Sequence, residues 1–172
     1  MKKFIIIIAF FIMQVNLVSA NVNIAVIDMD KIINVTKAGI TMLNQLNKIN
    51  DEILLDFKKQ EEKLKNKEIK LLSQKNILSK SDFDISLKNF KVEIEQYNEN
   101  RKKIITNFNI KKEKNIKRFL QMANKILAEY SDSKLISMVF QKKDLVIAKN
   151  ELDITEEVIM IIDKNIKDFK VK

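Results

Sequence analysis

A regular spacing of apolar side chains runs through the middle of the chain. From residue 43 to residue 78, the positions on one helix face follow at alternating intervals of three and four residues, which makes five consecutive heptads. Four of the eleven positions are polar, which is more than a dry coiled-coil seam tolerates. The pattern therefore predicts a long helix with a loose or water-exposed seam, at positions Leu43, Leu46, Asn50, Ile53, Phe57, Gln60, Leu64, Lys67, Leu71, Gln74 and Leu78.

A second helix of the same kind follows a polar break at residues 79–82. Ser81, with Asp84 three residues later, approximates a capping box that would start this helix. Two arms of about 40 residues, or roughly 60 Å of helix each, predict an antiparallel hairpin, which we assign to residues 44–125. The second seam comprises Phe83, Leu87, Phe90, Ile94, Tyr97, Arg101, Ile104 and Phe108, and after a phase shift the stripe continues through Ile116, Phe119, Ala123, Ile126 and Tyr130.

The segments on either side of the arms predict a small β-containing body. Residues 21–28 read as a buried strand, and Asp28 and Asp30 both offer N-caps for a helix that starts near Lys31. A kink in this helix is expected at Gly39. Residues 135–140 and 145–148 are rich in β-forming side chains and predict a two-stranded hairpin. Asp153, with Glu156 three residues on, forms a second box-like start for a closing helix. Its apolar face carries Val158, Ile161, Ile162, Ile166 and Phe169.

These elements together predict the fold class. The chain is expected to be α+β and mostly α, with a long antiparallel helical hairpin on a three-stranded body made from residues 21–43 and 126–172. A three-stranded sheet has exposed edges and little core, so such a body would gain much from oligomerisation that pairs the edges. The strand residues expected in its core are Ile24, Val26, Val139 and Val146.

The first twenty residues have the pattern of a secretory signal peptide. Lys2 and Lys3 precede an apolar run over residues 4–13, and Ser19 and Ala20 supply the small residues of a cleavage site. The apolar run is shorter than the roughly 20 residues that a membrane-spanning helix needs. The sequence therefore predicts export, with residues 1–20 removed and a mature chain that begins at Asn21.

The composition excludes several kinds of chemistry. The chain has one Gly and no His, Cys or Pro, so His-based triads, Cys nucleophiles, His/Cys metal sites, disulfides and glycine-rich phosphate loops cannot form. The remaining carboxylates, lysines and serines show no arrangement that distinguishes an active site. We therefore expect a protein that is not an enzyme, with no catalytic residues, no cofactor and no metal.

The net charge of +9 is unevenly distributed along the chain. Of the 32 basic residues 30 are Lys, and the abundance of Lys, Ile and Asn is typical of an AT-rich genome. A uniform bias does not explain why residues 44–125 carry +8 while the rest of the predicted mature chain carries −1. Positive arms would attract acidic chains or anionic membrane surfaces. Nucleic acid is not an expected partner, because the chain is predicted to be exported, has two Arg and lacks a binding motif.

The combination of these features resembles the Skp/OmpH family of periplasmic chaperones. The resemblance rests on the signal peptide, on Ile-Ala-Val-Ile-Asp-Met at residues 24–29, on the charged hairpin, on the strand pair, and on Asp-Ile-Thr at residues 153–155. It implies a periplasmic homotrimer whose strands form a shared barrel and whose arms surround a cavity for unfolded outer-membrane β-barrel proteins, held without ATP. The near absence of Arg departs from the family and leaves a lipopolysaccharide site without support.

Client contacts are expected at apolar arm positions that the hairpin seam does not need. An equally weighted alternative is that these residues pack between the two helices or against a neighbouring subunit. A second function class, an exported coiled-coil scaffold without clients, is less compatible with the polar seam. The client-binding candidates are Leu54, Leu55, Ile69, Leu72, Ile77, Ile85, Ile105 and Ile110.

Overall fold

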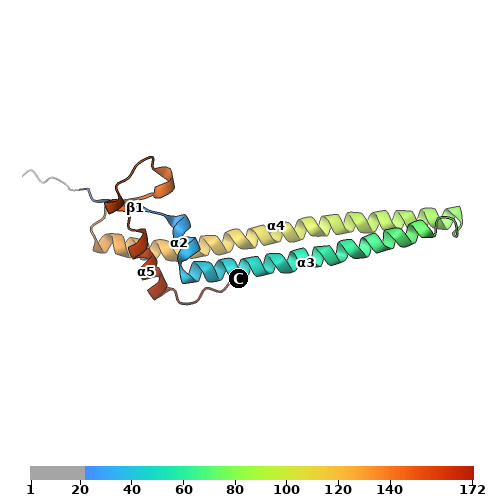
Figure 1. Ribbon diagram of the computed structural model, residues 1–172, viewed down its shortest axis with the longest axis horizontal. Helices are drawn as coiled ribbons and strands as arrows, with labels where there is room; N and C mark the ends of the chain where they lie inside the picture. Colours follow the sequence, from blue (N-terminus) through green and yellow to red (C-terminus); the bar gives the residue numbers. More distant parts are fainter. Residues whose placement is uncertain (1–21) are drawn as a thin grey trace, which may run out of the picture.

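The computed structural model describes residues 22–172, so the predicted signal peptide lies outside the described residues. Two long helices form an antiparallel hairpin, and the short elements gather at one end of it (Figure 1). This arrangement confirms the mostly helical fold with a long hairpin. The elements in chain order are β1 (Ile24–Ile27), α2 (Met29–Val35), α3 (Lys37–Ser73), α4 (Lys80–Ser133), β2 (Met138–Gln141), the 3-10 turns η1 (Lys142–Asp144) and η2 (Asn150–Leu152), and α5 (Thr155–Asn165).

The hairpin turn begins earlier than the sequence pattern predicts. Helix α3 ends at Ser73, so the last two predicted seam positions lie in the turn. Ser79, not Ser81, caps α4: its hydroxyl accepts from the Asp82 N–H at 3.2 Å and donates to the Asp82 carboxylate at 2.6 Å. Ser79 and Asp82 offer the capping-box spacing two residues before the predicted pair, so the helix starts as soon as that spacing allows.

The predicted seam between the two arms is confirmed, and it is loosely packed. Beyond the base of the hairpin, Phe57 and Leu71 are the buried residues of α3, while most other seam side chains are half-buried and Lys67 is exposed. With 37 and 54 residues, α3 and α4 extend for about 55 Å and 80 Å. The difference arises because the last turns of α4 continue alongside the body.

The tightly packed core lies at the base of the hairpin, where α5 contacts both α2 and α4. After its phase shift, the stripe of α4 turns toward this core and not toward α3 alone. The core also extends into the predicted arm, since Leu46, Phe119 and Ala123 all belong to it. Its least accessible apolar side chains are Ile27, Ile32, Ala38, Met42, Leu46, Phe119, Ala123, Val158 and Ile162.

The sheet differs from the predicted three strands. Within the described residues, β1 and β2 form a two-stranded parallel sheet, in which Ile24 pairs with Met138 and Ile27 with Gln141. The prediction of a strand at residues 145–148 was wrong. The segment after β2 lacks a turn residue suited to a tight hairpin, and it forms the 3-10 turns η1 and η2 instead. A single bridge from Val26 to Asp153 continues the sheet beyond them.

The N-cap expected near the start of the helical region is Asp28, and the kink expected at Gly39 is absent, because the helical region breaks at Thr36 instead. Asp28 accepts from the Lys31 N–H at 2.8 Å and caps α2. Thr36 separates α2 from α3, and its hydroxyl accepts from the Gly39 N–H at 3.2 Å. A Cβ at Gly39 would lie 2.0 Å from the carbonyl oxygen of Ile33, so the end of α2 leaves no room for a side chain.

The substitution Gly39→Ala is predicted to destabilise the body. The added methyl group meets backbone atoms, which cannot rotate away as a side chain can, and overpacking of this kind costs about 1–3 kcal/mol. Urea unfolding followed by circular dichroism measures the loss. The control is Asn47→Ala at an exposed position of α3, which should not lower stability. Equal unfolding midpoints for Gly39→Ala and the wild type would contradict the prediction.

Candidate functional site

All eight predicted client-binding residues lie on the outside of the hairpin. Their exposed fractions range from 42% for Ile105 to 79% for Ile77, so these side chains do not fill the seam between α3 and α4. The alternative that they pack between the two helices of one chain is therefore wrong for this group. Three further exposed apolar residues on these helices were missed, namely Ile40, Val92 and Met122. Their positions off the seam spacing could have revealed them.

The exposed apolar residues of α3 are confined to one flank of the helix. At about 100° per residue, the five positions fall within a sector of roughly 100° that extends from one side of the seam to the face opposite it. They extend over about 48 Å of helix, from the body toward the tip. We call this surface the α3 stripe; it consists of Ile40, Leu54, Leu55, Ile69 and Leu72.

Helix α4 carries a sparser set on its outer side. Ile85, Val92 and Ile110 lie within about 20° of one another around the helix axis and nearly opposite the seam. On this outer side of the helix, polar and charged residues occupy the positions between them. The hairpin thus offers apolar contacts that are spaced apart, not one continuous patch.

Open grooves follow the seam between the two helices. One groove of about 560 Å³ is lined mostly by residues of polar or charged type, among them Gln60, Lys63 and Gln96. Closer to the body, a smaller groove of about 240 Å³ has an apolar lining that includes Ile49, Ile53 and Ile104. These grooves are the structural result of a seam in which polar and apolar positions alternate irregularly.

An aromatic and ionic cluster joins the arms about midway along α3. The rings of Phe57 and Tyr97 meet edge-on with centroids 6.5 Å apart, and Arg101 lies 5.3 Å from the Phe57 centroid. Glu61 accepts from the Tyr97 hydroxyl at 2.8 Å and pairs with Arg101 at 3.5 Å. Burial and the contact with Glu61 raise the pKa of Tyr97. Tyr97 and Phe57 thus belong to the seam, as predicted.

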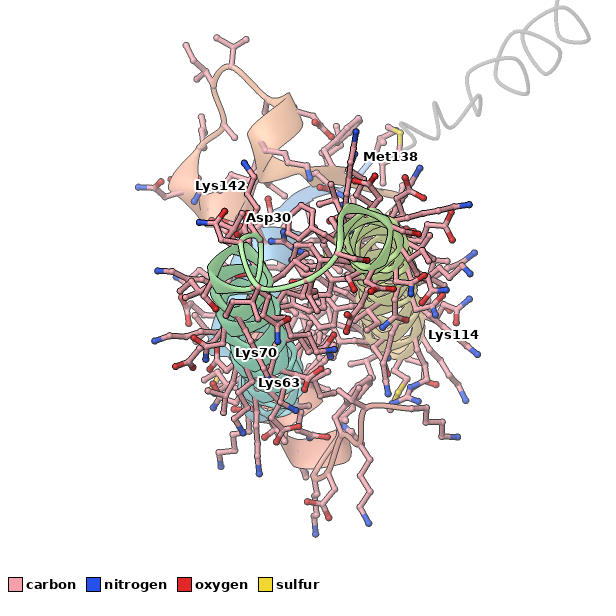
Figure 2. The ribbon with its side chains drawn as sticks, turned by 90° about the vertical axis from the view of Figure 1, so that its right-hand side faces the viewer. Asp30, Lys63, Lys70, Lys114, Met138 and Lys142 are labelled. Carbon is pink, nitrogen blue, oxygen red and sulfur yellow. The ribbon has the colours of Figure 1, made fainter. Side chains whose placement is uncertain are left out.

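The charged side chains of the arms surround the hairpin. Figure 2 looks along the hairpin from its far end and shows side chains tipped with nitrogen spread around both helices, among them Lys63, Lys70 and Lys114. Lys67 reaches across the seam to form an ion pair with Glu93. With a net charge of +8 over residues 44–125, the exposed apolar residues are set in a positively charged surface.

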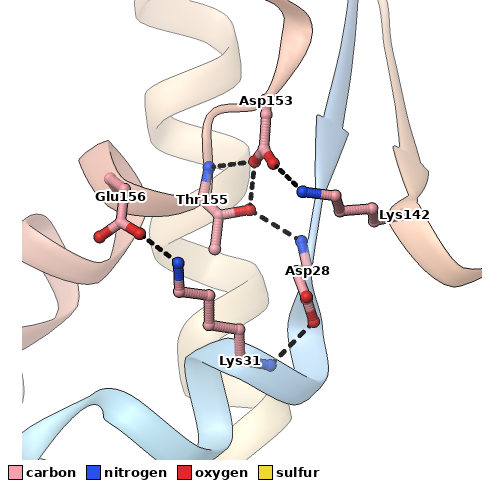
Figure 3. A network of polar contacts seen from close by, with 6 residues as sticks. All are labelled: Asp28, Lys31, Lys142, Asp153, Thr155 and Glu156. Carbon is pink, nitrogen blue, oxygen red and sulfur yellow. Dashed lines mark hydrogen bonds and ion pairs between the residues drawn. The ribbon is translucent and has the colours of Figure 1, made fainter. Parts of the chain in front are cut away.

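A polar network fastens the loop after β2 to the rest of the body (Figure 3). Thr155 is its centre: its hydroxyl accepts from the Asp28 N–H at 2.9 Å, and both its hydroxyl and its N–H donate to Asp153. Lys142 donates to the other Asp153 oxygen at 2.7 Å. The predicted capping box of Asp153 and Glu156 does not form. The Asp153 carboxylate accepts hydrogen bonds from Thr155 instead, and Glu156 forms an ion pair with Lys31.

The network determines the protonation behaviour of Asp153. Partial burial acts to raise the pKa of this carboxyl, but the hydrogen bonds from Lys142 and Thr155 outweigh burial and lower the pKa from 3.8 to about 2. On the other side of the network, the hydrogen bond to Glu156 raises the pKa of Lys31. The ion pair between Lys142 and Asp153 therefore remains formed well into the acidic range.

One face of the sheet is only partly covered by the elements of residues 22–172. The register places Ile24, Val26, Met138 and Phe140 on this face, and of these Val26 alone is buried. Val139 lies on the opposite face and packs against the helical core. Val146 is 100% exposed in the single chain, and its place in the core of an oligomeric body stays a prediction. The body thus presents an apolar sheet face on which Ile24, Met138 and Phe140 are exposed, and we call it the open face.

The described residues offer no sign of a metal or membrane-spanning site. Residues 22–172 contain no cluster of three or more acidic side chains that could hold a metal ion. Within the same range, no helix combines the length and the apolar character needed to cross a bilayer.

The fold and surface define a class of extended helical-hairpin proteins with a small α+β body. The chain belongs to the OmpH-like family of outer membrane proteins, whose sequence model matches residues 23–162. It is similar in structure to a protein from Caulobacter crescentus CB15 assigned as an outer membrane chaperone (OmpH-like), with a TM-score of 0.79 and 14% identity. That match covers 86% of this chain and 88% of the other. No curated protein sequence matches the chain.

Asp153 is predicted to make the body sensitive to acid. Because its pKa is lower in the folded chain, its contribution to stability is complete above pH 3.8 and is lost as the pH falls to about 2. After allowance for the exposure of Lys142, the contribution is about 1–2 kcal/mol. Urea unfolding between pH 6 and pH 2 should show a smaller acid-dependent loss in Asp153→Asn than in the wild type.

The control for this titration is Asp144→Asn, which removes a carboxylate from the same loop without touching the Asp153 contacts. Its acid-dependent loss of stability should match that of the wild type. If Asp153→Asn loses stability over this range as steeply as the wild type does, the network does not have the role described.

Proposed function

We propose that the chain is an ATP-independent holdase that binds unfolded outer-membrane β-barrel proteins in the periplasm and prevents their aggregation. The observation that carries this proposal is the α3 stripe, a row of exposed apolar side chains on a long, positively charged arm. Membership of the OmpH-like family and the similarity to a protein assigned as a chaperone support it. The work is non-catalytic and needs no cofactor.

Separated apolar side chains suit a client that has to remain unfolded. Full burial of one Leu or Ile side chain contributes about 1.5–3 kcal/mol, so a single contact of this kind is weak. Several such contacts along two arms act together through their effective concentration, and each can still break separately. A client is thus held firmly without a fixed bound conformation.

The positive charge of the arms adds attraction over a longer range. Lysine-rich walls favour acidic clients and accelerate encounter, most strongly at low ionic strength. The same field makes an anionic membrane surface a second possible partner. Nucleic acid is not a proposed partner, because export of the chain separates it from nucleic acid.

The active form is proposed to be a homotrimer whose sheets combine into a shared barrel. The open face supports this, because Ile24, Met138 and Phe140 are apolar, exposed and adjacent in the register. Val146 and Ile147 in the loop after β2 add exposed apolar area beside the body. Association of three bodies would cover these residues, pair the sheet edges and place three arms around a cavity. Residues 44–125 are the arm in this arrangement, and residues 1–20 direct export to the periplasm.

A light-scattering assay tests the proposed function. A urea-unfolded β-barrel protein diluted into buffer should stay soluble when the chain is present and no nucleotide is added. Equal precipitation with and without the chain would contradict the holdase proposal and favour a scaffold without clients.

The α3 stripe should account for much of this activity. In the triple variant Leu54→Ser, Ile69→Ser and Leu72→Ser, the loss of about 1 kcal/mol or more of client contact should raise the concentration that suppresses half of the scattering at least fivefold. The control carries Asn44→Ser, Asn47→Ser and Asn66→Ser at exposed polar positions of the same helix and should act like the wild type. Circular dichroism checks that both variants are folded. Equal activity of the two variants would remove the α3 stripe from the client site.

Assembly through the open face is testable by sedimentation velocity. The wild-type chain should sediment as an elongated trimer, and Met138→Glu should shift it toward the monomer because it places a charge in the proposed contact. The control is Lys149→Glu in the exposed loop before η2. A wild-type monomer, or a Met138→Glu trimer of unchanged stability, would contradict assembly through this face.

A further inference from the structure

The last six described residues, 167–172 and called the tail below, run back from α5 along the base of the hairpin (Figure 1). Phe169 is 3% exposed, and its ring meets that of Phe119 edge-on with centroids 6.1 Å apart. The guanidinium carbon of Arg118 lies 4.2 Å from the centre of the same ring. Val171 also packs against the core, whereas the alternate side chains are exposed, namely Lys170 and Lys172.

The side chain of Gln45 on α3 binds the backbone of the tail in two places. Its amide donates to the carbonyl oxygen of Phe169 at 2.7 Å, and its carbonyl accepts from the Val171 N–H at 3.0 Å. This is the pairing that a neighbouring β-strand would supply, made here by one side-chain amide.

Two side chains of α4 continue the recognition from the other helix. Asn115, which is 1% exposed, donates to the carbonyl oxygen of Lys172 and accepts from its N–H, both at 3.1 Å. Arg118 donates to the carbonyl oxygen of Lys170. Both helices of the hairpin thus bind one extended segment, and we call their contact surface, formed by Gln45, Asn115, Arg118 and Phe119, the tail cleft.

The tail cleft recognises two general properties of a peptide. Its polar side chains bind backbone groups, which every non-proline residue carries. Its apolar part accepts side chains at alternate positions, as an extended strand presents them, and holds an aromatic ring at one of these. An extended segment of alternating apolar and polar residues therefore matches the tail cleft.

We propose that the tail cleft is a binding site for an extended, alternating peptide segment with an aromatic side chain, and that the tail occupies this site in cis. The inference rests on the proposed function, because strands of membrane β-barrels have this alternation. The matched part of the OmpH-like family ends at residue 162, so the tail lies beyond the segment that this chain shares with the family model. An unfolded client displaces the tail when its local concentration is high enough.

The tail and a client compete for the cleft at effective concentrations that depend on how each is tethered to the chain. The tail is part of the same chain, so its effective concentration at the cleft is of millimolar order. A free peptide has to exceed that concentration or bind better. A client already held by the arms is itself tethered near the cleft and competes on similar terms.

The test uses the full chain and a fluorescent peptide with the tail sequence Lys-Asp-Phe-Lys-Val-Lys. The double variant Phe169→Ser and Val171→Ser keeps the full length of the chain but removes the two apolar side chains that anchor the tail. Fluorescence anisotropy should show peptide binding to this variant, and binding to the wild type at least tenfold weaker. A peptide with Ser in place of its Phe should not bind.

Two matched substitutions in the double variant locate the binding site. Gln45→Ala removes two contacts to the peptide backbone and should weaken peptide binding at least fivefold. The control is Gln60→Ala, which removes a glutamine of the same helix that binds Asp56 within that helix. No binding to a folded double variant, or equal effects of Gln45→Ala and Gln60→Ala, would overturn the proposal.

A second measurement covers the case in which the double variant does not fold. Hydrogen exchange of the wild-type chain should show faster exchange at the Val171 and Lys172 amides when excess peptide is added. Unchanged exchange at saturating peptide would overturn the proposal. These results are separable from the aggregation assay: peptide binding without holdase activity would contradict the proposed function alone, and holdase activity without peptide binding would contradict the tail cleft alone.

Discussion

The parallel pairing of β1 with β2 is the interaction on which the rest of the molecule depends. Parallel strands cannot be joined by a tight turn, so the chain has to leave the sheet and return to it, and α2, α3 and α4 form that crossover. The cost of closing a connection grows slowly with its length, so a hairpin of this size is compatible with a sheet of four residue pairs. The network around Thr155 then fastens α5 to the same strand.

The helices are packed tightly at the base of the hairpin and more loosely toward its tip, so the outer part is freer to move. At the base, Phe119, Met42 and Ile162 are wholly buried and hold the helices in one arrangement. Farther out, half-buried residues and polar grooves alternate, and the cluster around Phe57 and Tyr97 is a single tight contact between looser stretches. Regions with few buried contacts open at low free-energy cost. Apart from Ile40 and Met122 at the base, the exposed apolar residues of the two helices therefore lie where the structure adapts most easily.

The sequence pattern predicted the parts of the fold that repeat a single period. The three-four spacing located both helices and their seam, and positions off that seam, such as Leu54 and Ile85, proved to be exposed. The turn was displaced because Ser79 and Ser81 both start a capping spacing, and the pattern alone does not rank them. The third strand failed because residues 145–148 favour β structure locally but find no partner strand in one chain. The tail cleft could not be predicted, since Gln45 and Asn115 are 70 positions apart and act on backbone atoms.

Helix α4 is one uninterrupted rod of 54 residues from the tip of the hairpin to the foot of β2. Helix α3 joins the body through the break at Thr36 and the close backbone approach at Gly39, and these contacts hold its first turn in place. A sideways force at the tip therefore acts on a single helix. The outer part of this helix carries exposed apolar residues, and its other end packs against α5. A bulky molecule that bends the outer part of the hairpin would thus strain the packing around Phe119, far from its own contacts with the arm.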